Sequence, residues 1–261
     1  MALPLKKTSL DRLPPEGQLV NRAWFRTRGV TRPLVDSWLR SGKLEAVSHG
    51  LYRRPGPPLK WEQVVYSLNE MGVHVHVGGR SALELQGLAH YVPLQGVTRV
   101  SLYGAHRVPT WVQAFPGPYR LSIHRRRLFT TLPGSAIVSQ PFGAWDWPVP
   151  YAAAELALLE YLADVRTAAD FDFADKFFEG ATVLRPSLIR ELLLSCSHVL
   201  AKRLFLWFAE RHGYAWFKKL DTTGVDLGRG KRSVVKGGAL DRKYLITVPR
   251  TMVHGHEQPV Y

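Results

Sequence analysis

Hydrophobic positions recur at helical spacing over residues 31–41. Leu34 with Trp38, and Val35 with Leu39, are four positions apart and would therefore lie on one side of a helix. Polar and charged side chains occupy most of the remaining positions in this stretch. The pattern predicts a short amphipathic helix that buries one side and presents a polar, mostly cationic side to its surroundings.

The flanking segments extend this helix into a larger motif. Thr31 can accept an amide hydrogen bond at the start of the helix, and Gly42 is suited to ending it. Residues 18–29 are expected to form a preceding helix, joined to the second by a short turn that contains glycine. Residues 43–54 have strand-like halves around the turn sequence SHG, which predicts a hairpin. Two helices followed by a hairpin form a winged helix-turn-helix.

Beyond residue 60 the hydrophobic pattern alternates between helical and strand-like spacing. Gly78 and Gly79 precede a further expected helix, in which Ser81 and Glu84 have the spacing of a capping box. We also expect helices over 61–71, 150–165 and 185–213 (the last broken in the middle), strands over 73–77, 97–104 and 119–129, and a hairpin within 225–249 that turns at KGGALDR. No internal repeat interrupts this series.

The predicted fold class is α+β, with two domains. An N-terminal winged helix-turn-helix domain is expected over residues 1–92, and a C-terminal α+β domain over residues 93–261. The boundary would lie near Pro57 if the winged helix stands alone, and near Pro93 if the GGRSALEL helix packs onto it. The patterning leaves both positions open.

Composition and charge narrow the range of partners. The chain has 261 residues, 46% of them hydrophobic, and a net charge of +14, which favours a polyanionic partner. Residues 1–60 hold 12 Lys and Arg against 4 Asp and Glu, so the excess charge is concentrated on the predicted winged helix. Cys196 is the only cysteine, which indicates a reducing compartment. With no long apolar run and no signal-like N-terminus, we expect a cytoplasmic protein without a membrane partner.

The second predicted helix and the hairpin carry the candidate contacts with nucleic acid. A helix of this diameter fits the major groove of double-stranded DNA, and hairpin arginines can contact flanking phosphates or the minor groove. The candidate DNA-binding side chains are Thr31, Arg32, Asp36, Ser37, Arg40, Ser48, His49, Arg53 and Arg54. A winged helix with a purely structural or protein-binding role remains the alternative interpretation.

No pattern in the sequence favours an enzyme, a cofactor or a metal site. The Gly-rich stretch VHVGGRS is similar to the entry of a nucleotidyltransferase site, but that chemistry needs a nearby carboxylate pair to hold Mg²⁺. The acids between residues 61 and 150 are isolated: Glu62, Glu70, Glu84 and Asp146. His74 and His76 would share one face of a strand, and no third ligand accompanies them at a recognisable spacing. An acidic segment (Asp170, Asp172, Asp175) would hold a metal ion only if it were not helical.

The order of several segments resembles a known family. SWLRSGKLEAVSHGLYRR, a tryptophan-led helix, HVHVGGRSALELQGLAHY, VSLYG and VPTWV, and the late LGRGKRSVVKGGALDRKYLITVP are together similar to the AbiE-type (AbiEi) antitoxins of bacterial type IV toxin–antitoxin systems. The similarity runs from residue 10 to residue 250, and HVGGRSALELQGLAHY is its most specific part.

The resemblance implies an abortive-infection antitoxin in phage defence. Its winged helix would repress the operon by binding inverted repeats at its own promoter, using a recognition helix over Thr31–Arg40 and a wing over Ser48–Arg54. The C-terminal domain would counter a nucleotidyltransferase-like toxin, directly or indirectly. The location would be cytoplasmic, and nucleoid-associated when DNA is bound. The second hypothesis is a toxin-binding interaction module without sequence-specific DNA binding. The C-terminal domain carries further basic patches at Arg125, Arg126, Arg127, Arg229, Lys231, Arg232 and Lys236.

Overall fold

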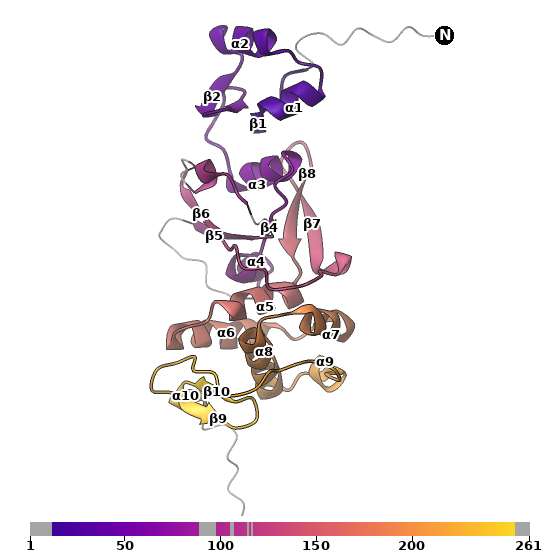
Figure 1. The fold of residues 1–261 in the computed structure, drawn as a ribbon, viewed down its shortest axis with the longest axis vertical. Helices are drawn as coiled ribbons and strands as arrows, with labels where there is room; N and C mark the ends of the chain where they lie inside the picture. Colours follow the sequence, from indigo (N-terminus) through magenta and orange to yellow (C-terminus); the bar gives the residue numbers. More distant parts are fainter. Residues whose placement is uncertain (1–11, 89–97, 105–106, 114, 116, 254–261) are drawn as a thin grey trace, which may run out of the picture.

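A computed structural model gives the fold and describes residues 12–88, 98–104, 107–113, 115 and 117–253. The elements follow one another along the long axis of the molecule (Figure 1). A small helix–strand domain lies at one end, a five-stranded sheet in the middle, a layer of helices next, and a two-stranded sheet at the other end. Within these ranges no helix is long and apolar enough to cross a membrane.

The N-terminal domain combines two helices with a three-stranded sheet, as expected for a winged helix-turn-helix. The strands lie in the order β1-β3-β2, and all neighbours are antiparallel. Its elements are β1 (Val20–Asn21), α1 (Arg22–Thr27), α2 (Arg32–Arg40), β2 (Glu45–Ser48) and β3 (Leu51–Arg53). Its core is built around Trp24, Phe25, Val35, Trp38 and Tyr52.

The first helix is shorter than the pattern over residues 18–29 predicts. Val20 pairs with Tyr52 in the sheet, so this part of the segment is a strand. The side chain of Asn21 then accepts a hydrogen bond from the backbone amide of Trp24 at 2.9 Å and begins α1 at Arg22. The predicted helix does not run through residue 21 because the Asn21 side chain caps a helix that begins at the next residue.

The middle of the molecule is a mixed sheet with the strand order β6-β5-β4-β8-β7. The pairs β4–β8 and β5–β6 are parallel, while β4–β5 and β7–β8 are antiparallel. The strands are β4 (His76–Val77), β5 (Thr98–Tyr103), β6 (Tyr119–Ile123), β7 (Ile137–Phe142) and β8 (Trp147–Ala152). Short 3-10 turns η2 (Thr110–Val112) and η3 (Gly134–Ala136) lie between them.

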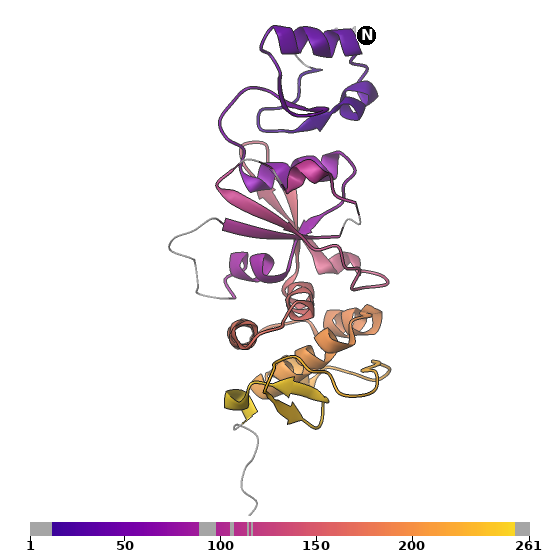
Figure 2. The same ribbon diagram turned by 60° about the vertical axis from the view of Figure 1, so that its left-hand side comes forward.

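Helices cover both faces of this sheet (Figure 2). Helix α3 (Trp61–Glu70) buries Val64, Val65 and Leu68 against one face, on the side of the winged helix. Helix α4 (Gly79–Leu85) lies on the other face and packs onto the helical layer. The winged helix is joined to α3 by a buried hydrogen bond of 2.9 Å from the amide of Leu19 to the hydroxyl of Ser67.

Two local predictions near β4 are wrong. The expected strand over 73–77 is reduced to two residues, and its two histidines differ, since His76 is buried and His74 is exposed. The expected capping box is also absent. Ser81 accepts from the amide of Ser101 and donates to the carbonyl of Arg99, because α4 begins earlier, at Gly79.

The helical layer holds the largest hydrophobic core. Helix α5 is buried along almost its whole length, and α8 contributes the aromatic side chains Phe205, Trp207 and Phe208. The expected break within residues 185–213 is confirmed, at residues 196–198. The helices are α5 (Ala154–Ala163), α6 (Ala168–Gly180), α7 (Pro186–Ser195), α8 (Val199–His212) and α9 (Ala215–Lys218).

The chain then forms the antiparallel pair β9 (Ala239–Asp241) and β10 (Ile246–Val248), followed by α10 (Arg250–Val253). The hairpin is confirmed, but its turn is displaced from KGGALDR to the residues after Asp241, because Ala239–Asp241 already belongs to the first strand. Arg203 of α8 is buried and fastens this region. Its guanidinium donates to the carbonyls of Leu227, Gly228, Gly230 and Leu245.

The domain boundary expected between residues 92 and 93 lies outside the described residues. The alternative near Pro57 falls on the segment between β3 and α3. Strands β4 and β5 come from either side of residue 92 and pair in one sheet, through His76 with Tyr103 and Val77 with Leu102.

Candidate nucleic-acid interface

Helix α2 is held by the core of the small N-terminal domain. Val35 and Trp38 face inward, and the rings of Trp38 and Tyr52 each lie 6.1 Å from the ring of Phe25. Thr31 occupies the capping position, but its hydroxyl makes no capping hydrogen bond, so that part of the prediction is wrong. The backbone of Thr31 and a proline in the first turn set the start of the helix instead.

The four α2 residues expected at the interface lie away from this core. Arg32, Ser37 and Arg40 are exposed, and Asp36 is partly exposed. Arg32 lies one helical turn from Asp36, with Nε to Oδ2 at 3.9 Å. An exposed pair of this kind contributes about 0.5 kcal/mol at most, so both side chains can rearrange around a ligand at little cost. Arg40 makes no ion pair with any residue that the structure describes.

The hairpin β2–β3 forms the wing beside α2. Its register shifts between Ala46 and Ser48, which lets Ser48 pair with Leu51 across a very tight turn. Gly50 has a φ of 71°, a backbone conformation that residues with a Cβ atom rarely adopt. Ser48 and His49 are exposed at the tip of the wing, where they are accessible to a partner.

The two wing arginines differ in their surroundings. Arg53 forms an ion pair with Glu45 across the hairpin, and its guanidinium also donates to the carbonyls of Pro57 and Gly56 at 2.8 and 3.2 Å. Within the described ranges, Arg54 has a single long ion-pair contact, of 4.0 Å, with Glu16. Arg53 therefore fixes the base of the wing, whereas Arg54 is the more available cation.

Side chains outside the expected set enlarge this cationic surface. Arg26 of α1 and Lys43 after α2 are both exposed. A groove of about 450 Å³ runs between α1 and α2, with Arg26, Arg32 and Asp36 among its lining residues. The charge excess of residues 1–60 was the available signal for these positions. Helical periodicity could not identify them. The pattern places the start of the first helix at residue 18, but α1 begins at Arg22, so the predicted faces of that helix do not locate Arg26.

The C-terminal basic patches are not part of this surface. Arg125–Arg127 follow β6 rather than lying on it, and all three are exposed. Arg229, Lys231, Arg232 and Lys236 are exposed on the segment between α9 and β9. That segment lies at the opposite end of the molecule from α2 (Figure 1).

The residues considered for metal binding have other partners or are separated. Asp170 accepts from the amides of Arg166 and Thr167 at the start of α6, and Asp175 pairs with Arg211 and His212. The acidic segment is helical, contrary to the condition for a metal site there. In the described parts of the chain, no three His, Cys, Asp or Glu side chains come together as metal ligands would.

Comparison with known proteins gives two family matches that together span most of the chain. Residues 6–94 match the N-terminal domain of the AbiEi antitoxin, a transcriptional regulator, and residues 97–249 match the transcriptional regulator and AbiEi antitoxin of type IV toxin–antitoxin systems. No curated protein matched the chain. Among solved structures, the RV2827C protein from Mycobacterium tuberculosis is similar, with 14% identity, a TM-score of 0.52, and coverage of 92% of this chain and 88% of that chain. At this identity the similarity concerns the fold alone.

Proposed function

Because the chain belongs to the AbiEi antitoxins, transcriptional regulators of type IV toxin–antitoxin systems, we propose that it represses its own operon through its winged helix. Helix α2 would enter the major groove of inverted repeats in the promoter, and the wing would contact the flanking backbone. The observation that carries this proposal is the cationic outer face of α2, which is exposed and, among the residues that the structure describes, makes one weak ion pair.

The side chains have distinct expected roles. Arg32 and Arg40 are suited to base edges or phosphates of the groove, and Asp36 and Ser37 between them can accept from or donate to base edges. Thr31, Ser48 and His49 would fix the register through backbone contacts. Arg54 would contact a phosphate directly, whereas Arg53 would act mainly by holding the wing in shape.

The C-terminal domain is proposed to counter a nucleotidyltransferase-like toxin encoded beside it, directly or indirectly. Residues 97–249 match a model described as transcriptional regulator and AbiEi antitoxin of type IV toxin–antitoxin systems, and the segment between α9 and β9 that carries one basic cluster lies at the far end of the molecule from α2. A repressor that remained bound to DNA would thus keep this cluster accessible. The protein would act in the cytoplasm and be associated with the nucleoid while bound to its operator.

The test of repression is binding of the full chain to DNA upstream of its own gene, followed by fluorescence anisotropy over a salt series. Scrambled DNA of equal length is the control. We expect a preference of about a thousandfold for the upstream DNA. Six phosphate contacts would give a slope of about −5 in a plot of log affinity against log salt concentration. Equal, strongly salt-dependent affinity for both DNAs would show that the binding is electrostatic and independent of sequence. That result would refute sequence-specific repression.

A matched pair of variants separates the two proposed roles. Arg32→Ala with Arg40→Ala should abolish the preference for upstream DNA, while Arg120→Ala with Arg242→Ala removes the same charge elsewhere and should retain it. Both variants should still rescue growth of cells that express the toxin. Loss of rescue in a well-folded Arg32/Arg40 variant would contradict the assignment of DNA binding and toxin neutralisation to separate parts of the chain. A native chain that rescues growth but ignores DNA sequence would identify an interaction module instead.

A further inference from the structure

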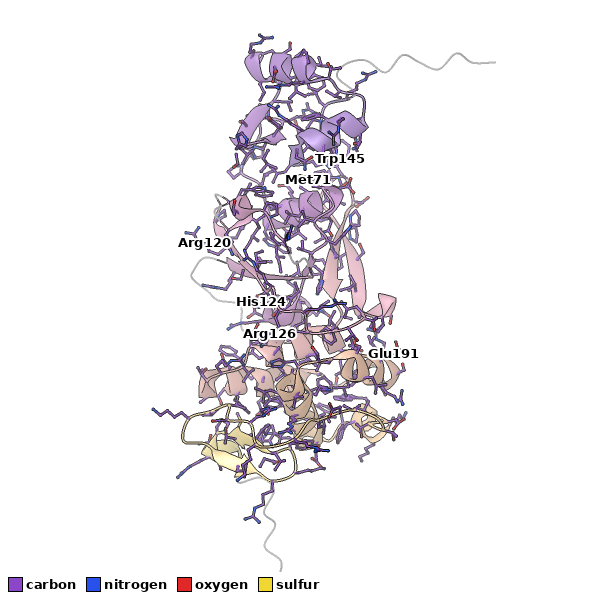
Figure 3. The ribbon with its side chains drawn as sticks, viewed as in Figure 1. Met71, Arg120, His124, Arg126, Trp145 and Glu191 are labelled. Carbon is purple, nitrogen blue, oxygen red and sulfur yellow. The ribbon has the colours of Figure 1, made fainter. Side chains whose placement is uncertain are left out.

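A pocket of about 320 Å³ lies at the edge of the middle sheet, where β5 and β6 end and the chain runs toward the helical layer. We call it the arginine pocket. The residues that matter for its chemistry are Tyr103, His124, Arg125, Arg126, Arg127 and Thr131. Figure 3 shows His124 and Arg126 at the junction between the sheet and the helices, below Arg120, which points outward from the same strand region.

The carboxylates beside this pocket already have partners. Glu160 is buried in its floor and accepts hydrogen bonds from Nε2 of His76 at 2.7 Å and from the amide of Gly79 at 2.9 Å. Asp164 pairs with Nδ1 of His124 at 2.7 Å. Burial would raise the pKa of Asp164, but the hydrogen bond and charge of His124, together with the charges of Arg126 and Arg166, outweigh it, and the pKa is lowered. Histidines and a backbone amide therefore use the hydrogen-bonding capacity of these carboxylates, and Asp164 balances part of the charge of Arg126 from a distance beyond that of a direct ion pair.

In the part of the chain that the structure describes, Arg125, Arg126 and Arg127 form no ion pair within 4.0 Å. Arg127 donates to the carbonyls of Phe129 and Thr130 at 3.2 and 2.9 Å, which shapes the pocket wall. Three adjacent cations at one concave site repel each other, and a bound anion would relieve that repulsion.

Arg126 has an uncharged partner beside the pocket. Its Nη1 lies 3.0 Å from Nε2 of His198, whose Nδ1 lies 3.2 Å from the amide of Ala201. Burial, together with the charge of Arg126, lowers the pKa of His198, which favours the neutral ring. A neutral imidazole does not compensate the charge of a guanidinium, and one contact leaves further N–H groups of Arg126 to donate to an anion.

We propose that the arginine pocket binds the phosphate group of a small phosphorylated ligand, such as a nucleoside monophosphate. One guanidinium saturates a carboxylate in a bidentate pair, whereas a phosphate presents three oxygens and uses several donors. The pocket offers guanidiniums, an imidazole and the Thr131 hydroxyl together. Its volume is at the low end for ligand sites, which matches a mononucleotide or sugar phosphate rather than a larger molecule.

The test is calorimetric titration of the full chain at about 150 mM salt, which screens distant charge. The probes are inorganic phosphate, ribose 5-phosphate and uridine 5′-monophosphate, with uridine and acetate as controls. We expect at least one phosphate-bearing probe to bind, and the two controls to show no heat. Stronger binding of the esters would assign an organic phosphate. Equal or stronger binding of inorganic phosphate would assign the free ion.

Two variants make the test specific. Arg125→Gln with Arg126→Gln should weaken phosphate binding by about tenfold or more, because two charge-assisted donors are lost. Arg120→Gln removes an exposed arginine outside the pocket and should change the affinity less than about twofold. Absent binding to all phosphates, or equal weakening by both variants, would overturn the proposal. The inference does not depend on repression, since Arg32→Ala with Arg40→Ala should leave phosphate affinity unchanged.

Discussion

Nε2 of His76 donates a hydrogen bond to Oε1 of Glu160 at 2.7 Å, although 84 positions separate them along the chain. Both side chains are buried. The second carboxylate oxygen, Oε2, accepts from the amide of Gly79 at 2.9 Å, at the start of α4. One carboxylate of the helical layer thus fixes both a central strand and the helix that follows it.

This arrangement makes Gly78 sensitive to substitution. A Cβ atom there would lie 2.1 Å from Oε2 of Glu160 and 2.6 Å from the ring of Tyr103. We expect Gly78→Ala to lower the free energy of unfolding by about 2–3 kcal/mol or more, as overpacking does. Urea denaturation followed by tryptophan fluorescence measures this. The control is Gly134→Ala, where an added Cβ meets nothing within 4 Å and stability should be nearly unchanged. Equal effects of the two variants would contradict the role given to this close contact.

Acid should destabilise the protein through buried carboxylates, of which Glu155 is the clearest. Burial would raise its pKa, but hydrogen bonds from Arg185 outweigh this and hold the pKa below its ordinary value of 4.5. A carboxylate with a lower pKa in the folded state stabilises the fold above 4.5, and this contribution is lost as pH falls through the folded value. Unfolding free energies measured between pH 7 and pH 3 should therefore decline, and less steeply in Glu155→Gln. An unchanged pH dependence in that variant would count against the assignment.

Arg203 should be the most important single arginine for stability. Its buried guanidinium donates to four carbonyls of the segment between α9 and β10, at 2.7 to 3.2 Å. Arg203→Met would remove the side-chain donor from all four carbonyls, of which, among the residues that the structure describes, only that of Leu245 keeps a backbone donor, the amide of Arg232 at 2.8 Å. We expect a loss of about 3 kcal/mol or more in unfolding free energy. Arg190→Met, which breaks an exposed pair with Asp221, should cost about 0.5 kcal/mol. Thermal and urea denaturation of both variants would decide this, and similar losses would show that burial is unimportant here.

Substitutions of the two wing arginines are expected to affect different properties, DNA affinity for Arg54 and stability for Arg53. Arg54→Ala should weaken binding to all DNA sequences alike and reduce the magnitude of the salt slope by about one, with little change in stability. Arg53→Ala should lower unfolding free energy by about 1 kcal/mol, because the Glu45 pair and two carbonyl contacts are lost. Anisotropy and denaturation of each variant test this. Destabilisation by Arg54→Ala alone would reverse the two roles.

The sequence predicted the elements whose evidence is local. The pairs Leu34 with Trp38 and Val35 with Leu39 are confirmed on the inner side of α2, where Val35 and Trp38 are buried and the two leucines are partly buried. The strand-like halves around SHG are confirmed as β2 and β3. The family resemblance is confirmed as well. These features depend on side chains a few positions apart, so periodicity and turn chemistry suffice to find them.

Features that depend on distant partners could not be predicted. The Ser81 and Glu84 spacing indicated a capping box, but the Ser81 hydroxyl accepts a hydrogen bond from the amide of Ser101 in β5. The carboxylate that accepts from the first amide of α4 belongs to Glu160 instead. The arginine pocket likewise combines β4, the end of β5 and the segment after β6 with Glu160 of α5. Nothing in the local sequence gives the three-dimensional register that brings these segments together. Which of the candidate residues touch DNA stays a prediction.

The pairing of β4 with β5 has a consequence for how the chain can be divided. A cut between residues 92 and 93 would separate two neighbouring strands of one sheet, and neither fragment would contain the whole sheet. The contacts that hold the two sides together are non-covalent, and they include the Glu160 bonds to His76 and Gly79. Produced together as separate polypeptides, residues 1–92 and 93–261 should therefore reassociate by split-protein complementation, and size-exclusion chromatography would show them eluting as one species.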